Sequence, residues 1–165
     1  MQKKIMSKRF RIAQDDLTGL EITQLLSLHL QEMHRWSPAC KVHAMPVERL
    51  RQPDVTFYSA WARSDRGHDQ LAACGALKEI DPERGELKSM RAAPEFRGQG
   101  AGQAILVYLI EQAQDRRYKW LGLETGNAEP FIPARKLYEK LGFRECQPFG
   151  EYVSDDFSLC MEMQL

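Results

Sequence analysis

Three strand-like runs follow one another along the middle of the chain, and the elements after them constrain the fold. The runs VTFYSAWA (55–62), QLAACGALKEI (70–80) and GELKSMRAA (85–93) are separated only by the turn-rich segments RSDRGHD and DPER. Such connections join antiparallel neighbours, so we expect a meander. An apolar helix-like run (103–117) and a further strand-like run, KWLGLET (119–125), complete a βαβ unit with the third strand. A meander feeding one crossover predicts a mixed sheet.

Further elements are expected on both sides of this unit. They are a first strand (9–13), a helix (18–35), a short helix (47–51), a helix (133–142) and a last strand (157–164). Thr18 and Glu21 have capping-box spacing at the start of the first of these helices. A largely apolar stripe then recurs at helical spacing through Ile22, Leu25, Leu26, His29 and Met33.

Length and charge limit the classes of function. At 165 residues the chain fits one domain (1–165) that can bury a core. It carries 23 basic and 23 acidic residues, so bulk electrostatics does not favour a nucleic-acid partner. The basic segment KKIMSKRFR (3–11) is interpreted as a solvated tail that runs into an edge strand. The alternative, a nucleic-acid-binding arm, is less favoured.

Cysteine usage points to a reducing compartment, and hydropathy gives no sign of a membrane-spanning segment. Cys40, Cys74, Cys146 and Cys160 form no CxxC pair and no zinc spacing, so no metal is expected. Cys74 and Cys160 lie in apolar runs, where a buried thiol is the ordinary interpretation. No run approaches membrane length, and no signal-peptide core stands at the start. We therefore expect a cytoplasmic protein with no membrane partner.

The stretch RGQGAG (97–102) carries the strongest functional signal. A helix that begins here leaves its first backbone N–H groups without internal partners, and these attract anions together with the helix dipole. Glycine removes the Cβ atoms that would block a phosphate, and Arg97 adds a positive charge. The P-loop pattern is absent, and the spacing of Gly98, Gly100 and Gly102 does not fit GxGxxG. A pyrophosphate cradle of another kind is indicated.

The pattern that does match is Arg-x-x-Gly-x-Gly on Arg97, Gly100 and Gly102, placed after a strand and a proline. With SMRAAPEFRGQGAGQAILVYLIEQA and the later ARKLYEKLGF, the chain resembles the GNAT superfamily of acyl-CoA-dependent N-acyltransferases from about Val55 to Leu165. The end of the chain resembles a bacterial branch that includes an indole-acetic-acid acetyltransferase. The resemblance implies an α/β (α+β) fold, in which a mixed, mostly antiparallel sheet splays between its fourth and fifth strands and carries helices on both faces.

The resemblance also implies where acetyl-CoA binds. Pantetheine would lie in the gap between the splayed strands, against the backbone of Met90, Arg91 and Ala92. The pyrophosphate would bind the N–H groups of Gly98, Gln99, Gly100, Ala101, Gly102 and Gln103, with Arg97 at the rim. Many relatives carry an asparagine seven residues before the catalytic tyrosine, but Phe131 stands there in this chain. Asn127, in the preceding loop, is the candidate substitute.

The expected reaction is attack of an amine on the thioester, which requires a neutral amine and a protonated or stabilised leaving thiolate. Tyr138 matches the family's general-acid tyrosine; its alternative is a half-buried tyrosine that packs on the sheet. Three carboxylates are candidates for the base: Glu86, Glu79 and Glu124. Glu86 stands four residues before Met90 and is therefore expected on the same face of its strand.

The acceptor side has weaker signals. His29 is interpreted as a core-edge histidine with satisfied hydrogen bonds, or else as part of the acceptor pocket. Trp36, Trp61, Tyr58 and Phe149 are either core residues or an aromatic acceptor pocket.

We expect direct acetyl transfer to a primary amine of a small molecule. The alternatives are a protein or peptide N-acetyltransferase and a non-catalytic acyl-CoA sensor. The acyl chain and the oligomeric state, with a homodimer as one alternative, stay open.

Overall fold

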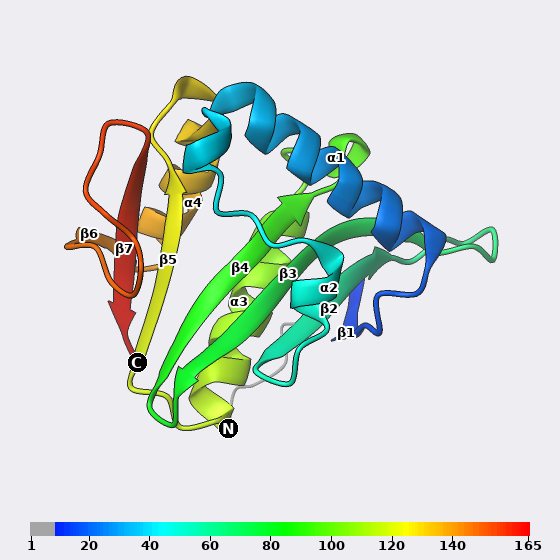
Figure 1. Ribbon diagram of the computed structural model, residues 1–165. Coiled ribbons are helices and arrows are strands. Elements are labelled where there is room, and N and C mark those ends of the chain that lie inside the picture. Colours follow the sequence, from blue (N-terminus) through cyan, green and yellow to red (C-terminus); the bar gives the residue numbers. More distant parts are fainter. Residues whose placement is uncertain (1–8) are drawn as a thin grey trace.

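The computed structural model describes residues 9–165 and contains one seven-stranded sheet in the order β1-β2-β3-β4-β5-β7-β6 (Figure 1). The strands are β1 (Phe10–Gln14), β2 (Val55–Ala62), β3 (Gln70–Asp81), β4 (Arg84–Ala92), β5 (Trp120–Gly126), β6 (Arg144–Cys146) and β7 (Ser158–Gln164). The α-helices are α1 (Leu20–Trp36), α2 (Val47–Leu50), α3 (Ala101–Asp115) and α4 (Ile132–Lys140). Short 3-10 turns lie at η1 (Ala39–Lys41), η2 (Pro94–Phe96) and η3 (Glu129–Phe131).

The meander and the crossover are confirmed. β1 to β4 pair antiparallel in chain order, and β4 pairs parallel to β5 after α3. The β4–β5 pairing is confined to Arg84–Glu86 with Trp120–Gly122. Beyond it the green β4 and the yellow β5 diverge toward the end that α1 crosses (Figure 1). The predicted splay between the fourth and fifth strands is therefore present.

Helices cover both faces of the sheet, as expected. In Figure 1, α1 and α2 lie in front of the strands, and α3 and α4 lie behind them. α1 packs on β3 and β4, whereas α3 packs on β2, β3 and β4. Ile105 and Leu109, both fully buried on α3, anchor this second layer. Since α1 crosses the sheet where β4 and β5 separate, it can wall a site there.

A bulge in β4 reverses one expectation about the site. Ala76 pairs with Lys88, but Cys74 pairs with Arg91, so β4 contains one extra residue at this point. Ser89 adopts φ 53°, a left-handed conformation. Lys88 and Arg91 consequently share the α1 face, together with Glu86, whereas Met90 faces α3. The expectation that Glu86 and Met90 share a face is wrong because the bulge shifts the alternation by one residue.

The start of α1 also differs from its prediction. The Thr18–Glu21 capping box does not form. Gly19 is the N-cap without a side-chain bond, and the Thr18 hydroxyl instead donates to Asp16 at 2.6 Å. The local Asp16 turn therefore takes the hydroxyl that the cap needed. The apolar stripe is confirmed for Ile22, Leu25 and Leu26, which pack into the core. His29 and Met33, farther along the same stripe, line a cavity instead.

Other sequence-based expectations have mixed outcomes. The short strand β6 was not predicted; it is only three residues long. Cys74 and Cys160 are buried free thiols, as predicted. The tail proposed for residues 3–11 falls mostly outside the described residues. Over residues 9–165, no helix combines the length and the apolar character that crossing a bilayer requires.

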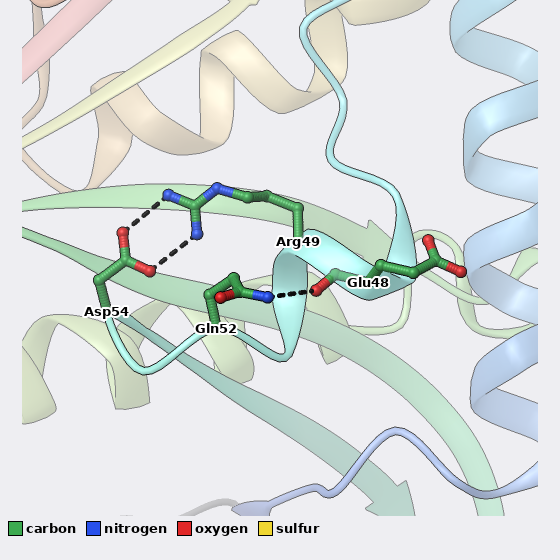
Figure 2. A network of polar contacts seen from close by, with 4 residues as sticks. All are labelled: Glu48, Arg49, Gln52 and Asp54. Carbon is green, nitrogen blue, oxygen red and sulfur yellow. Dashed lines mark hydrogen bonds and ion pairs between the residues drawn. The ribbon is translucent and has the colours of Figure 1, made fainter.

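A polar network fixes the short helix that follows the α1-side loop (Figure 2). The Arg49 guanidinium donates two hydrogen bonds of 2.7 Å to the carboxylate of Asp54, just before β2 begins. The Gln52 side chain donates to the backbone carbonyl of Glu48 at 3.3 Å. The bidentate pair lowers the pKa of Asp54, chiefly through its hydrogen bonds from Arg49. The pair connects α2 to the residue that precedes β2, and α2 in turn fixes the end of the segment that follows α1.

Candidate active site

A cavity of about 810 Å³ lies where β4 and β5 separate. Its walls come from residues 87–92 of β4, from the loop and helix start at 97–103, and from residues 123–126 of β5. Residues of η3 and α4 close one side; α1 and the segment 37–44 close another. The cavity therefore joins the glycine-rich loop to both splayed strands, as the predicted acyl-CoA site requires.

The glycine loop has the backbone conformation that its sequence suggests. Gly98 and Gly100 have φ of 71° and 86°, a region that side chains with a Cβ rarely occupy. A Cβ added at either position would meet no atom within 4 Å. Packing within the protein therefore does not require glycine at these two positions. The left-handed backbone of the turn requires it, and the missing side chains leave open space in front of the helix.

The N-terminus of α3 offers free amides to this space. The first backbone bond of the helix runs from Ala104 N–H to Gly100 O, at 2.9 Å. The N–H groups of residues 101–103 precede it and so lack intrahelical acceptors. Gln99 differs, because its N–H donates to Phe96 O at 3.2 Å and its side chain lies outside the cavity. Of the N–H groups predicted to bind the pyrophosphate, that of Gln99 is therefore already used, whereas those of residues 101–103 remain available for a ligand.

The edge of β4 supplies the second part of the predicted cofactor site. Met90, Arg91 and Ala92 all line the cavity. The β5-facing edge of β4 has no paired strand beyond Glu86 within residues 9–165. Such an edge can receive an extended chain through its backbone groups. Arg97, half-exposed at the loop, also lines the cavity and lies at its rim.

Glu124 on β5 and Tyr138 on α4 both line the cavity. Burial raises the pKa of Glu124 to about 7, although Lys88 across the gap opposes this shift. Burial also raises the pKa of Tyr138 above its usual value, and the Glu124 carboxylate adds to the effect. The Tyr138 ring packs edge-on against Phe143, with centroids 5.8 Å apart. Glu124 is thus poised to exchange a proton near neutral pH, and Tyr138 stays protonated.

Glu86 is buried but does not line the cavity. The Tyr152 hydroxyl donates to Glu86 and accepts a hydrogen bond of 2.7 Å from the Lys88 ammonium. Lys88 Nζ also lies 3.5 Å from Glu86 Oε1. Lys88 itself reaches the cavity wall. The Glu86 carboxylate is therefore engaged in a closed network behind the site.

Two further predicted site residues, besides Gln99 and Glu86, lie outside the cavity. Glu79 accepts a hydrogen bond of 3.1 Å from the Tyr118 hydroxyl and pairs with Gly85, at the end of β4 where the sheet is still closed. Asn127 accepts a hydrogen bond of 2.7 Å from Arg135. The structure thus brings Tyr138 and Glu124 together with the β4 edge and the glycine loop, but not Glu79 or Asn127.

The acceptor side contains residues that the sequence indicated only weakly. Trp36 lines the cavity and packs edge-on against Phe131, with centroids 5.5 Å apart. Trp61, Tyr58 and Phe149 lie elsewhere. His29 also lines the cavity, and its buried Nδ1 has no hydrogen-bond partner within the described chain. The interpretation of His29 as a core-edge residue with satisfied hydrogen bonds is therefore wrong. The alternative comes from the family resemblance, in which the first helix walls the acceptor pocket, and His29 does line the cavity.

Comparison with known proteins decides the family. Residues 22–143 match the acetyltransferase (GNAT) family. The chain belongs to the GNAT family. This GNAT chain is 45% identical over 151 residues to the uncharacterized N-acetyltransferase YsnE of Bacillus subtilis (strain 168), across 92% of this chain and 97% of the relative. It is 32% identical over 148 residues to an IAA acetyltransferase of Azospirillum brasilense, across 88% and 90% of the two chains.

A solved structure agrees with this assignment at the level of the fold. The GNAT family acetyltransferase from Elizabethkingia anophelis, with acetyl-CoA bound, superimposes with a TM-score of 0.68 at 20% identity, across 96% of this chain and all (100%) of that one. The GNAT chain described here is an acyl-CoA-dependent acetyltransferase. Residues 9–165 contain no group of three or more His, Cys, Asp or Glu side chains that could hold a metal ion.

Proposed function

We propose that this enzyme transfers an acetyl group from acetyl-CoA directly to the primary amine of a small molecule. The observation that carries the proposal is the single cavity shared by the glycine loop, the free edge of β4, Glu124 and Tyr138. Its acceptor side is closed by α1, by the segment 37–44 and by Phe157. A pocket bounded by these segments suits a small acceptor better than a protein or peptide, which would need a long open groove.

Glu124 is the base that we propose among the three candidates. Glu86 is engaged with Tyr152 and Lys88, and Glu79 lies away from the cavity. With a pKa of about 7, the Glu124 carboxylate can accept a proton from the attacking nitrogen at neutral pH. The N–C bond forms, the C–S bond breaks, and the amine proton passes to Glu124.

Tyr138 acts on the leaving sulfur in this proposal. Because its pKa is raised, Tyr138 keeps its proton until the C–S bond breaks, and it then donates a hydrogen bond to the sulfur. The thiolate finally takes one proton, from Tyr138 or from water, so that coenzyme A leaves as the thiol. The backbone amides at the tip of α3 hold the pyrophosphate, and the amides of the β4 edge hold the pantetheine arm.

Tyr138→Phe tests this assignment. We expect turnover to fall about 10²-fold while the KM for acetyl-CoA stays within about twofold, because only the hydroxyl is removed. Thiol release from acetyl-CoA, measured with a thiol reagent across a panel of amines, provides both constants. Tyr118→Phe is the matched control, because Tyr118 is equally buried but bonds Glu79 outside the cavity. Unchanged turnover in Tyr138→Phe would remove this residue from the mechanism.

A further inference from the structure

Three buried side-chain atoms of residues 9–165 have no hydrogen-bond partner: His29 Nδ1, Ser89 Oγ and Arg91 Nε. All three residues line the cavity between β4 and β5. A buried polar atom without a partner costs about 1–3 kcal/mol, and native proteins pair nearly all such atoms. Their presence around one cavity indicates that a polar group of a ligand completes this part of the site.

Arg91 is the group with the most unused donor capacity. Its side chain is only 8% exposed, and its Nη2 forms an ion pair with Glu32 of α1. The Nε–H has no partner, although a guanidinium presents five donors in a planar fork. The guanidinium lies over the Trp36 ring, with Arg91 Cζ 5.9 Å from the ring centroid. A planar fork that is held in place on one edge suits a carboxylate on the other.

The charges around Arg91 leave a positive excess. Arg91 and Arg97 share the single carboxylate of Glu32, with Arg97 at 3.5 Å. Two guanidinium groups and one carboxylate leave one positive charge at this end of the cavity. Because the Arg97 side chain is 53% exposed whereas Arg91 is buried, the excess reaches the interior of the site through Arg91.

His29 stands beside Arg91 as a neutral group. Burial lowers the pKa of His29 to about 4, and the Arg91 cation contributes to this shift. A neutral imidazole can donate one hydrogen bond to an anion without bringing a second charge. The α1 helix therefore supplies a polar but uncharged companion for the buried guanidinium.

The rest of the acceptor side is apolar. Met33 and Trp36 of α1, Val42 of the following segment, and Phe131 and Phe157 line it. Glu124, the proposed base, lies across the gap on β5. The cavity thus offers three features: an anion-binding group at Arg91, an apolar surface beside it, and the Glu124 carboxylate on the opposite side, which can receive a proton from an amine.

We propose that the acceptor is an amino carboxylate with an apolar body, such as a hydrophobic amino acid, and that Arg91 and His29 bind its carboxylate. This inference rests on the proposed function, because it places the amine at Glu124. Arg91 and His29 set the acceptor class in this proposal, whereas Glu124 and Tyr138 carry out the transfer.

The test measures binding first. Calorimetry on the protein saturated with coenzyme A compares N-acetyl-L-phenylalanine with N-acetyl-L-phenylalaninamide, which lacks only the negative charge. We expect the acid to bind at least about 10-fold more tightly, as charge-assisted hydrogen bonds of about 1.5–3 kcal/mol imply. The double variant Arg91→Gln/Glu32→Gln removes the fork without leaving an unpaired carboxylate, and it should reduce the preference below about threefold.

Arg11→Gln/Asp69→Asn is the matched control, because it removes an arginine–carboxylate pair of 3.6 Å on the protein surface. It should keep the full preference. The proposal is overturned if the acid and the amide bind alike, if neither binds, or if the Arg91/Glu32 variant keeps the preference. Loss of coenzyme A affinity in that variant would also overturn it, since Arg91 would then serve the nucleotide.

Activity separates this inference from the proposed function. Thiol release with L-phenylalanine and with L-phenylalaninamide should favour the amino acid in the unmodified enzyme. Release with both amines but no preference would overturn the carboxylate site and leave the transferase proposal intact. Selective binding of the acid with no thiol release from any amine would overturn the proposed function and support the carboxylate site.

Discussion

At the scale of single residues, the ionisation of Glu124 links activity and stability. The unfolded chain releases this proton near pH 4.3, whereas the folded chain holds it until about pH 7. Between these values the folded state binds more protons, so stability falls as pH rises and levels off above pH 7. Above about pH 7 the Glu124 carboxylate is ionised and can act as the base, and in the same pH range its buried charge destabilises the folded state most.

Glu124→Gln should therefore change two measurements in opposite directions. We expect kcat/KM at pH 8 to fall about 10²-fold, and the acidic limb near pH 7 in its pH profile to disappear. Urea unfolding at pH 8 should show a gain of about 1–3 kcal/mol, with little gain at pH 4. Glu79→Gln is the comparison and should keep the limb. An unchanged profile in Glu124→Gln would assign the base to another group.

At the scale of elements, the start of α3 separates folding from ligand binding. Gly102 is the second residue of the helix, and a Cβ there would lie 3.6 Å from Leu137 Cδ2, an ordinary contact. Alanine is a better helix former than glycine. Unlike Gly98 and Gly100, Gly102 is therefore not required by the backbone conformation of the protein.

Gly102→Ala should stabilise the fold by about 0.5–1 kcal/mol and yet weaken coenzyme A binding by about 10-fold, because the new methyl group crowds the amides that face the pyrophosphate. Chemical unfolding and calorimetry measure the two effects independently. Gly67→Ala, at a surface turn with φ 88°, serves as the control, since it should lose stability without changing affinity. Unaltered affinity in Gly102→Ala would place the pyrophosphate elsewhere.

The same elements show what the sequence could predict. Strand and helix periodicity located β2 to its ends and α1 to within two residues, because alternation and the apolar stripe follow directly from burial. The motif located the glycine loop that lines the cavity. The bulge at Ser89 was not predictable, since serine gives no sign of a left-handed φ. That bulge decides which of Glu86, Met90 and Arg91 share a face, so the part that Arg91 takes on the acceptor side could be argued only from the structure.

At the scale of the whole molecule, the splay divides the sheet into two parts whose strands pair with each other only at one end. The meander, α3 and the glycine loop form one part, and β5, β7, β6 and α4 form the other (Figure 1). Strand pairing across the divide is limited to Arg84–Glu86 with Trp120–Gly122. The cavity is lined from both parts. A ligand that fills it therefore adds contacts between the two parts.

Coenzyme A should accordingly stabilise the molecule as a unit. At 100 times its Kd, binding adds about 2.7 kcal/mol, which corresponds to a rise in Tm of about 5–10 °C for a domain of this size. Hydrogen exchange should slow at residues 87–92 of β4 and also at residues 123–126 of β5. Adenosine 3′,5′-bisphosphate, which lacks the pantetheine arm, should protect the start of α3 but not β5. Protection of β5 by the nucleotide alone would mean that the arm does not lie between the strands, because the two parts would then be coupled without it.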